Sequence, residues 1–167
     1  MERGEKVIDF FKLVRTGTPE QVQAAIDEGA DVKARSAQGS PTLMIAAENP
    51  NPDVITTLLK AGADIRARDN DRKTSLMFAA GFNQNPKVIT TLLMAGADLE
   101  AQDTNGSTPL MHAALFSDCP EVITTLLDAG AEVKAKDNEG KTAYDYVQVN
   151  DKLKGTDAYR QLNKALK

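Results

Sequence analysis

Apolar side chains in this chain recur with helical spacing, and the pattern occurs three times with little change. In residues 86–95, Val88, Ile89, Leu92 and Leu93 follow an i, i+1, i+4, i+5 spacing, which places them on one face of a helix. The same segment reads VITTLLKAGAD at 54–64, VITTLLMAGAD at 88–98 and VITTLLDAGAE at 122–132. The pattern therefore predicts three equivalent amphipathic helices.

Glycine and proline keep the same phase as this pattern. A glycine follows each predicted helix and fits the left-handed conformation that closes a helix. These glycines are separated by 33, 34 and 34 residues, and a proline stands ten residues before each. Such a period indicates stacked supersecondary units that bury their apolar faces against their neighbours. The pairs are Pro19 and Gly29, Pro52 and Gly62, Pro86 and Gly96, and Pro120 and Gly130.

Each unit is predicted to hold another helix before the repeated segment. Thr74 and Thr108 are suitable N-cap residues, and Pro109 fits the first helical position, where the missing N–H has no partner anyway. The helix continues through small side chains such as Ala113-Ala114. Thr104-Asn105-Gly106 predicts a turn before it. The two longer spacings hold one extra residue, which the phasing places in the loop between the helices.

The two ends differ from the inner units and are predicted to be caps, as a soluble array of stacked units requires. The N-terminal helix is expected to cover the open core with Phe10-Phe11. Caps at both ends indicate a complete array. The N-terminal helix is predicted from Val7, Ile8, Phe10, Phe11 and Val14, and the C-terminal helix, from about Thr156, carries Tyr159, Leu162 and Leu166 on one side.

Composition narrows the classes of function. The 41% hydrophobic content excludes a disordered chain, and the net charge of −4 argues against a general nucleic-acid binder. No apolar run approaches the length of a membrane span, and no signal peptide is visible. The single Cys119 cannot form an internal disulfide, so it does not indicate an oxidising compartment. A cytoplasmic location is the default expectation.

Residues GSTPLMHAA at 106–114, together with Leu126-Leu127 and Ala129-Gly130-Ala131, resemble the ankyrin repeat family, whose signature is Thr-Pro-Leu-His-x-Ala in repeats of about 33 residues. The array is similar to those common in bacteria. The resemblance implies one all-α domain over residues 1–167, an ankyrin-repeat solenoid of stacked helix-turn-helix units with short β-hairpin connections. The five expected units span about 5–35, 36–68, 69–102, 103–136 and 137–167, and the first and last are the caps.

Two departures from the family pattern are visible. Methionine replaces the signature histidine, so a hydrogen bond usual in the family is expected to be absent; the positions are Met44, Met77 and Met111. Arg72 occupies a turn position that is glycine in other units, and a positive φ there would cost about 1 kcal/mol. The corresponding glycines are Gly39, Gly106 and Gly140.

No catalytic, cofactor-binding or metal-binding residues are predicted. His112 is the only histidine, and no Cys or carboxylate stands at a metal-site spacing from it. A nucleophilic pair of His112 and Cys119 would need side-chain contact and an oxyanion hole, which nothing else in the sequence indicates. The chain is therefore expected not to be an enzyme.

The resemblance implies a concave binding surface of hairpin tips and first helices, in which the positions that vary between units select the partner. Phe82 and Phe116 occupy matched places in adjacent units. Either they are exposed anchors or they fold back and pack on their own helices. The candidate partner-binding residues are Asn70, Asp71, Lys73, Phe82, Thr104, Asn105, Ser107, Leu115, Phe116, Asn138 and Lys141.

Basic residues recur in the hairpin arms, and Glu100 and Gln102 interrupt them. This stripe either steers an acidic partner toward the chain or is simply a solvated edge. Its members are Lys33, Arg35, Arg66, Arg68, Lys134 and Lys136.

The predicted function is a non-enzymatic protein-protein interaction module, monomeric, with an unidentified protein partner and no nucleic acid. One alternative is a regulatory or inhibitory subunit that covers an enzyme's active site. Another is a designed or engineered repeat scaffold, although irregular details such as Asn49-Pro50-Asn51-Pro52 look more natural. A hidden enzyme would require a deep pocket with convergent polar groups around His112.

Overall fold

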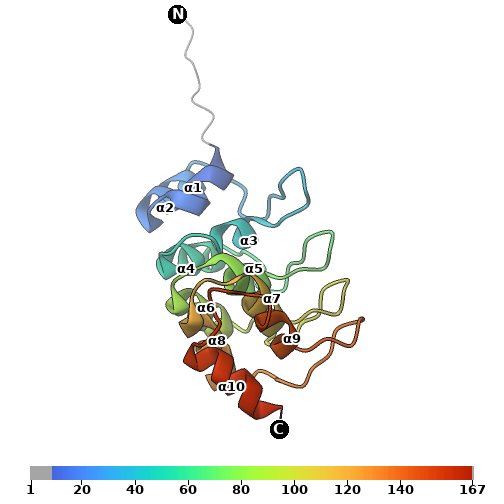
Figure 1. Cartoon of the computed structure of the whole chain (residues 1–167). Helices are drawn as coiled ribbons and strands as arrows, with labels where there is room; N and C mark the ends of the chain where they lie inside the picture. The colour runs from blue at the N-terminus through green and yellow to red at the C-terminus, as the bar shows by residue number, and fades with distance from the viewer. Residues whose placement is uncertain (1–8, 167) are drawn as a thin grey trace, which may run out of the picture.

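The computed structural model describes residues 9–166, which form ten short helices in five stacked pairs, with loops projecting to one side (Figure 1). This arrangement confirms the expected all-α solenoid. In two loops the expected hairpin consists of a single antiparallel bridge, Arg35 to Pro41 and Arg68 to Thr74. The first helices are α1 (Phe10–Thr16), α3 (Thr42–Ala46), α5 (Ser75–Phe82), α7 (Pro109–Phe116) and α9 (Ala143–Val147). The second helices are α2 (Pro19–Asp27), α4 (Pro52–Lys60), α6 (Pro86–Met94), α8 (Pro120–Asp128) and α10 (Asp157–Ala165).

Local residue types account for where these helices begin and end. The side chains of Thr74 and Thr108 accept hydrogen bonds from the backbone N–H groups of Met77 and Met111, as N-caps do. In each helix pair the second helix begins with proline, except in the last pair, where α10 begins with Asp157. Gly96 has a φ of 92°, and the glycines after α2, α4 and α8 are likewise left-handed. The predicted caps and stops are therefore confirmed.

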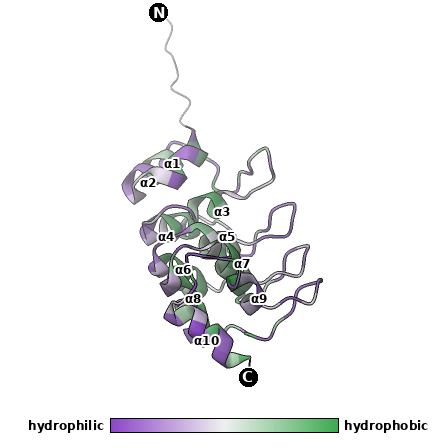
Figure 2. Ribbon diagram, viewed as in Figure 1, coloured by the Kyte–Doolittle hydropathy of each residue, from purple (hydrophilic) through white to green (hydrophobic). Residues whose placement is uncertain are grey.

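The core runs continuously through the stack, between the row of first helices and the row of second helices. Val88, Ile89 and Leu92 on α6 are fully buried, and the matching residues of α4 and α8 are buried with them. First helices such as α5 and α7 are mostly hydrophobic, whereas the second helices also carry polar residues and the loops are largely polar (Figure 2). Burying one such aliphatic side chain contributes about 1.5–3 kcal/mol.

The two ends of the stack are closed by different means. Phe10 and Phe11 pack partly buried against the core from α1, as expected, while Val7 and Ile8 lie outside the described residues. At the other end Thr156 caps α10, and Leu162 buries its side chain completely. None of the described helices is long and apolar enough to cross a membrane.

The extra residue of the longer units lies in the first helix, not in the loop as the phasing suggested. The buried Asn83 stands nine positions after the N-cap Thr74, whereas the corresponding Asn49 stands eight positions after the N-cap Pro41. With eight, α3 stops at Ala46, and the chain continues in tighter turns that are closed by hydrogen bonds from the N–H of residue i to the carbonyl of residue i−3. With nine, α5 remains α-helical to Phe82. The insertion therefore lengthens α5 and α7 and places a phenylalanine at the end of each.

Asparagine side chains connect each helix pair, or layer, of the stack to the layer before it. Asn83 donates from Nδ2 to the carbonyl oxygens of Ala47 and Asn49, at 2.8 and 2.9 Å. Asn49 donates to carbonyls at the end of α1, and Asn150 donates to those at the end of α7. These amides satisfy carbonyls that the ends of short first helices leave without an intrahelical partner. They also set the register of one layer on the next.

The joint between the α5–α6 layer and the α7–α8 layer lacks this amide. Ser117 occupies the asparagine position, and its side-chain hydroxyl bonds only within its own loop, to Cys119. At the loop tips, Asn70 and Asn138 likewise donate to carbonyls of the preceding loop, whereas Thr104 occupies the equivalent position at this joint. Here the backbone N–H of Thr104 bonds to the carbonyl of Asp71, and an aromatic contact described below spans α5 and α7.

The loop-tip asparagines also explain where glycine is required. A Cβ on Gly39 would lie 2.5 Å from Asn70 Oδ1, and a Cβ on Gly106 would lie 2.7 Å from Asn138 Oδ1. Arg72 has the same left-handed backbone, with a φ of 62°, as its position in the pattern predicted. The next loop offers Thr104 there instead of asparagine. The side chain at residue 72 thus avoids the steric conflict but retains the conformational strain.

Two arginines of the basic stripe are structural. Arg35 Nη1 donates to the carbonyl of Arg68 at 2.7 Å, and Arg68 Nη1 donates to the carbonyl of Gln102 at 2.8 Å. Each guanidinium therefore connects its loop to the next one, 33 or 34 residues along the chain. These two charges serve the stacking of the loops.

The hydrogen bond expected to be lost with the signature histidine is present in one unit as a bond to sulfur. The backbone N–H of Thr74 lies 3.4 Å from Met77 Sδ. A thioether is a weak acceptor, so this contact replaces a stronger bond only in part.

We expect Asn83→Ser to lower the free energy of unfolding by about 1–3 kcal/mol, because two buried carbonyls lose their donor. The serine can still accept the bond from the Asn85 N–H, as Ser117 does from Cys119. The reverse change, Ser117→Asn, is expected to raise the free energy of unfolding by about 1 kcal/mol, because it supplies a donor to the α5–α7 joint. Chemical denaturation of both variants measures these two changes in the free energy of unfolding. A loss of stability in Ser117→Asn would contradict the prediction.

Arg72→Gly is expected to stabilise the chain by about 1 kcal/mol, since it removes the cost of a left-handed arginine. Gly106→Ala is the matched control and should destabilise by more than this, because strain and the Asn138 contact act together. Thermal unfolding of the two variants measures the difference. A loss of stability in Arg72→Gly would show that the arginine side chain makes a compensating contact.

Candidate functional site

A groove of about 330 Å³ lies between the loops and the first helices of the C-terminal half. We call it the loop groove. Six of the predicted partner-binding residues line it: Lys73, Asn105, Ser107, Leu115, Phe116 and Asn138. The other lining residues are Asp103, Met111, His112, Asp137, Glu139 and Tyr146.

The remaining predicted residues lie around the loop groove rather than in its lining. Asn70 uses its side-chain amide to bond the carbonyl of Gln38, so that amide stabilises the stacking of the loops. At the loop tips, Asp71 forms an ion pair with Lys73, and Lys141 forms one with Glu139. Thr104 is exposed. Phe82 adjoins the groove through its contact with Phe116.

The aromatic pair, Phe82 and Phe116, is the most exposed apolar feature beside the groove. The rings stack with centroids 5.6 Å apart, yet 54% of Phe82 and 46% of Phe116 remain exposed. Phe78 packs on Phe82 from within α5, and His112 lies 5.9 Å from Phe116. The rings therefore do not fold away under the loops. They pack on each other across two layers and leave their outer surfaces open.

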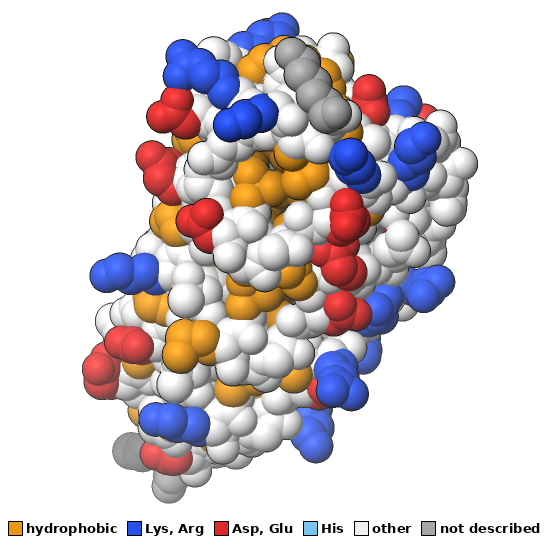
Figure 3. Space-filling view, turned by 90° about the horizontal axis from the view of Figure 1, so that it is seen from below, with side chains coloured by type: hydrophobic (Ala, Val, Ile, Leu, Met, Phe, Trp, Pro, Cys, Tyr) orange, Lys and Arg blue, Asp and Glu red, His pale blue; other side chains and the backbone are white. Residues whose placement is uncertain are grey.

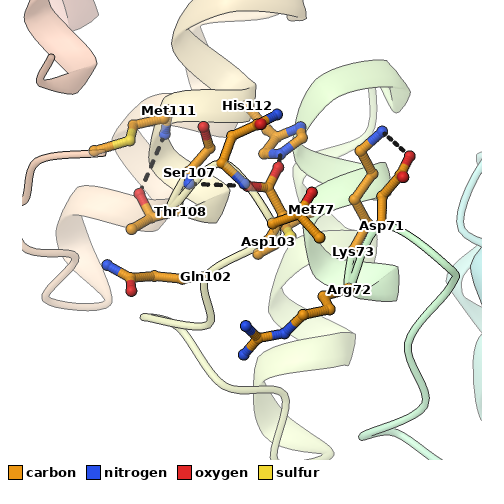
Figure 4. Close-up of polar contacts among 12 residues, drawn as sticks. Asp71, Arg72, Lys73, Met77, Gln102, Asp103, Ser107, Thr108, Met111 and His112 are labelled. Carbon is orange, nitrogen blue, oxygen red and sulfur yellow. Dashed lines mark hydrogen bonds and ion pairs between the residues drawn. The ribbon is translucent and has the colours of Figure 1, made fainter. Parts of the chain in front are cut away.

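Asp103 and His112 form the floor of the loop groove (Figure 4). Asp103 Oδ1 accepts from the backbone N–H groups of Asn105 and Ser107, and its Oδ2 lies 2.9 Å from His112 Nε2. Burial lowers the pKa of His112 below its ordinary value, although the neighbouring Asp103 carboxylate acts in the opposite direction. At neutral pH the imidazole is therefore uncharged and donates its Nε2–H to the carboxylate.

The next loop repeats this arrangement with tyrosine. Asp137 Oδ1 accepts from the N–H groups of Glu139 and Lys141, and Tyr146 O–H donates to Oδ2. Burial alone would raise the pKa of Asp137, but these hydrogen bonds outweigh it, so the pKa lies below its ordinary value. The bond to Asp137 raises the pKa of Tyr146 to about 12, which keeps its hydroxyl protonated.

Sequence reasoning missed these floor residues, although a signal was present. Asp103 and Asp137 stand 34 residues apart at the same place before the loop tip, and His112 and Tyr146 both stand four residues after the N-cap threonine. At the same position, four residues after the N-cap, two other units have the apolar residues Ile45 and Phe78. A polar residue at this position was therefore the signal. Its carboxylate partner could be recognised only once the loop was known to fold back over the helix.

Two ion pairs border the loop groove. Lys73 Nζ lies 3.3 Å from Asp71 Oδ2, and Lys141 Nζ lies 2.6 Å from Glu139 Oε2. Lys141 also lies over the Tyr146 ring, 5.8 Å from its centroid. Exposed pairs of this kind contribute little stability, so they remain available for exchange with a charged partner.

Cys119 does not belong to this site. Its Sγ contacts Glu121 Oε2 at 3.1 Å and the carbonyl of Gln84 at 3.5 Å. Burial and the Glu121 carboxylate raise the pKa of the thiol, which disfavours the nucleophilic thiolate. Within residues 9–166, no group of three His, Cys, Asp or Glu side chains is arranged to hold a metal ion. The groove thus offers apolar contact and hydrogen bonding.

A space-filling view from below shows hydrophobic side chains gathered in separate groups along the middle of that face, with acidic and basic side chains mainly along its borders (Figure 3). The molecular surface therefore places apolar contact beside charge, as recognition surfaces commonly do.

Comparison with known proteins agrees with this architecture. A family model described as ankyrin repeats, in three copies, matches residues 10–103, 43–137 and 76–154. Mitochondrial disaggregase of Bos taurus is 39% identical over 61 residues, and that of Homo sapiens is 38% identical over 61 residues. Each match covers 36% of this chain but only 9% of the disaggregase, so the chain spans a small part of these relatives.

The lowered pKa of His112 predicts a pH-dependent stability. The unfolded chain, with an ordinary histidine near pKa 6.5, binds a proton more readily than the folded chain does. The folded state is therefore expected to lose stability as the pH falls through about 6.5, by up to about 1.4 kcal/mol for each unit of pKa difference.

His112→Tyr provides the control, because Tyr146 shows that tyrosine can bond the matching aspartate. The free energy of unfolding of both proteins is compared between about pH 8 and pH 5. As the pH falls, the wild type should lose stability relative to the variant. Parallel stability curves would mean that His112 titrates normally in the folded chain.

Proposed function

We propose, on the premise that this chain belongs to the ankyrin repeat family, that it binds a protein partner through the loop groove and the aromatic pair. Members of this family are generally protein-protein interaction modules and typically not enzymes. The surface proposed for binding and the chemistry of that surface rest on the residues described above.

The exposed aromatic pair is the observation that carries the proposal. Phe82 and Phe116 are about half exposed in a chain whose other large apolar residues are mostly buried. Aromatic residues beside a groove are the typical anchors of protein interfaces, and truncating such an anchor costs about 2–4 kcal/mol of binding. Leu115 lies next to the pair and extends its apolar surface into the groove.

The bonds between loops support a rigid surface. Arg68 connects its loop to Gln102, Thr104 connects to Asp71, and Asn138 connects to both Thr104 and Asn105. A surface held in one conformation before binding loses less conformational entropy when a partner docks. The loop groove is therefore preorganised for recognition.

The polar groups of the groove support binding rather than catalysis. His112 has its Nε2 occupied by Asp103, and Cys119, with a disfavoured thiolate, contacts Glu121 instead of the imidazole. Hydrogen bonding and apolar contact suffice for a recognition surface, and the proposal assigns no chemical step to the chain.

The double variant Phe82→Ser/Phe116→Ser is expected to remain folded and to lose only about 1–2 kcal/mol of stability, because half of each ring is already exposed. By comparison, truncating the fully buried Leu92 to alanine should cost about 2–5 kcal/mol. Circular dichroism during denaturation measures both. A loss as large as that of Leu92→Ala would make the rings part of the core.

Affinity capture from lysate of the source cells tests recognition itself, with the folded double variant as one control bait. Met94→Ser is the second control, since Met94 is 84% exposed on α6, outside the groove lining. A partner is expected to be retained by wild type and by Met94→Ser and lost by the double variant. Retention of the same proteins by all three baits would contradict the proposed surface.

A further inference from the structure

Acidic side chains outnumber basic ones in the lining of the loop groove. Asp103, Asp137 and Glu139 line the groove, and Lys73 is the only basic side chain in that lining. Lys73 is paired with Asp71, and Lys141 outside the lining is paired with Glu139. These border pairs nearly cancel, so the net negative charge of the lining comes from the two floor aspartates. The charge of Lys141 also acts on Asp137 and contributes to the low pKa of that carboxyl, so Asp103 is the less compensated of the two.

The floor aspartates are buried and held by uncharged donors. Asp103 has 2% of its side chain exposed, and it accepts two backbone N–H bonds and one bond from His112. Asp137 accepts two backbone N–H bonds and the Tyr146 O–H. Within the described part of the chain, neither carboxylate has a lysine or arginine at ion-pair distance.

Low exposure strengthens the field of these two carboxylates at the groove, because little water screens them. The low pKa of His112 keeps the imidazole neutral, so it adds no opposing positive charge at neutral pH. The free outer surface of the groove therefore favours a cation, while its wall offers Leu115, Phe116 and, through the stack, Phe82.

We infer that the partner presents an extended peptide segment in which an aromatic or aliphatic side chain packs on Phe82 and Phe116, and a nearby lysine or arginine enters the loop groove above Asp103 and Asp137. This inference rests on the proposed function and adds the chemistry of the partner. The aliphatic stem of such a residue suits the apolar wall, and its charged head suits the acidic floor.

The direction of this preference differs from the one considered for the basic stripe. Arg35 and Arg68 keep their charge, but each donates to a loop carbonyl, so these two guanidinium groups are held at the loops and are less free to reach a partner. The acidic floor lies closer to the exposed aromatic pair, where the anchor of a partner would dock. The groove thus selects a cationic segment rather than an acidic one.

Selection from a displayed library of random short peptides tests the inference. The bait is the wild-type chain, with counter-selection on Phe82→Ser/Phe116→Ser, so that retained peptides depend on the aromatic pair. The expected consensus has one large apolar residue with lysine or arginine a few positions away. A consensus with aspartate or glutamate in that place, or with no charged residue, overturns the inference but leaves the proposed recognition surface standing.

Synthetic peptides of the selected sequence then measure the charge contribution by fluorescence anisotropy. Replacing the cationic residue by alanine is expected to weaken binding by about tenfold, and added salt should weaken the parent peptide more than the alanine peptide. Equal affinities of the two peptides overturn the inference. Because this change is made in the peptide, it cannot fail through misfolding of the protein.

Asp103→Asn completes the cycle. The asparagine oxygen can accept the two backbone N–H bonds while its amide donates to the other tautomer of His112. The variant should bind the parent peptide several-fold more weakly and the alanine peptide unchanged. An equal loss for both peptides would assign a structural role to Asp103 and contradict the inference. If no peptide depends on the aromatic pair, the proposed function fails together with it.

Discussion

The inner layers of this molecule depend on burying a first helix that is apolar on nearly all sides. Helices α5 and α7 are each only eight residues long, and a helix of this length is not stable alone in water. Each is stabilised only when a second helix covers one side and the neighbouring layers cover the others. The contact that one layer makes with the next is therefore the unit of stability, and the proposed binding surface is a consequence of that contact.

Polar side chains decide how the layers register. Apolar packing is tolerant of small shifts, whereas the amide of Asn83 must meet two particular carbonyls of the preceding layer. The guanidinium of Arg68 and the loop-tip amide of Asn138 impose the same condition at the outer edge. Buried and edge hydrogen bonds thus convert a stack that could slide into one that holds its loops at fixed spacing. The loop groove exists because of that fixed spacing.

Local rules account for what could be predicted from the sequence. Thr74, Pro86 and Gly96 define helix ends through interactions that reach only a few residues, so the helices and the left-handed Arg72 were predictable. The pairing of Asp103 with His112 requires a loop to fold over the next helix. The amides of Asn83 and Asn150 reach carbonyls more than 30 residues away. Such partners are determined by the stacking itself, which no single repeat reveals.

The serine at residue 117 makes one joint of the stack different from the other joints. Three of the four joints between neighbouring layers carry a side-chain amide, from Asn49, Asn83 or Asn150, that donates to the preceding layer. Between α5 and α7 no such amide is present among the described residues, and a stack of two rings spans the joint. This joint therefore relies on close packing of the two longest first helices and on the stacked rings. It should tolerate a small displacement of one layer along the other better than the joints that a directional side-chain amide fixes in place.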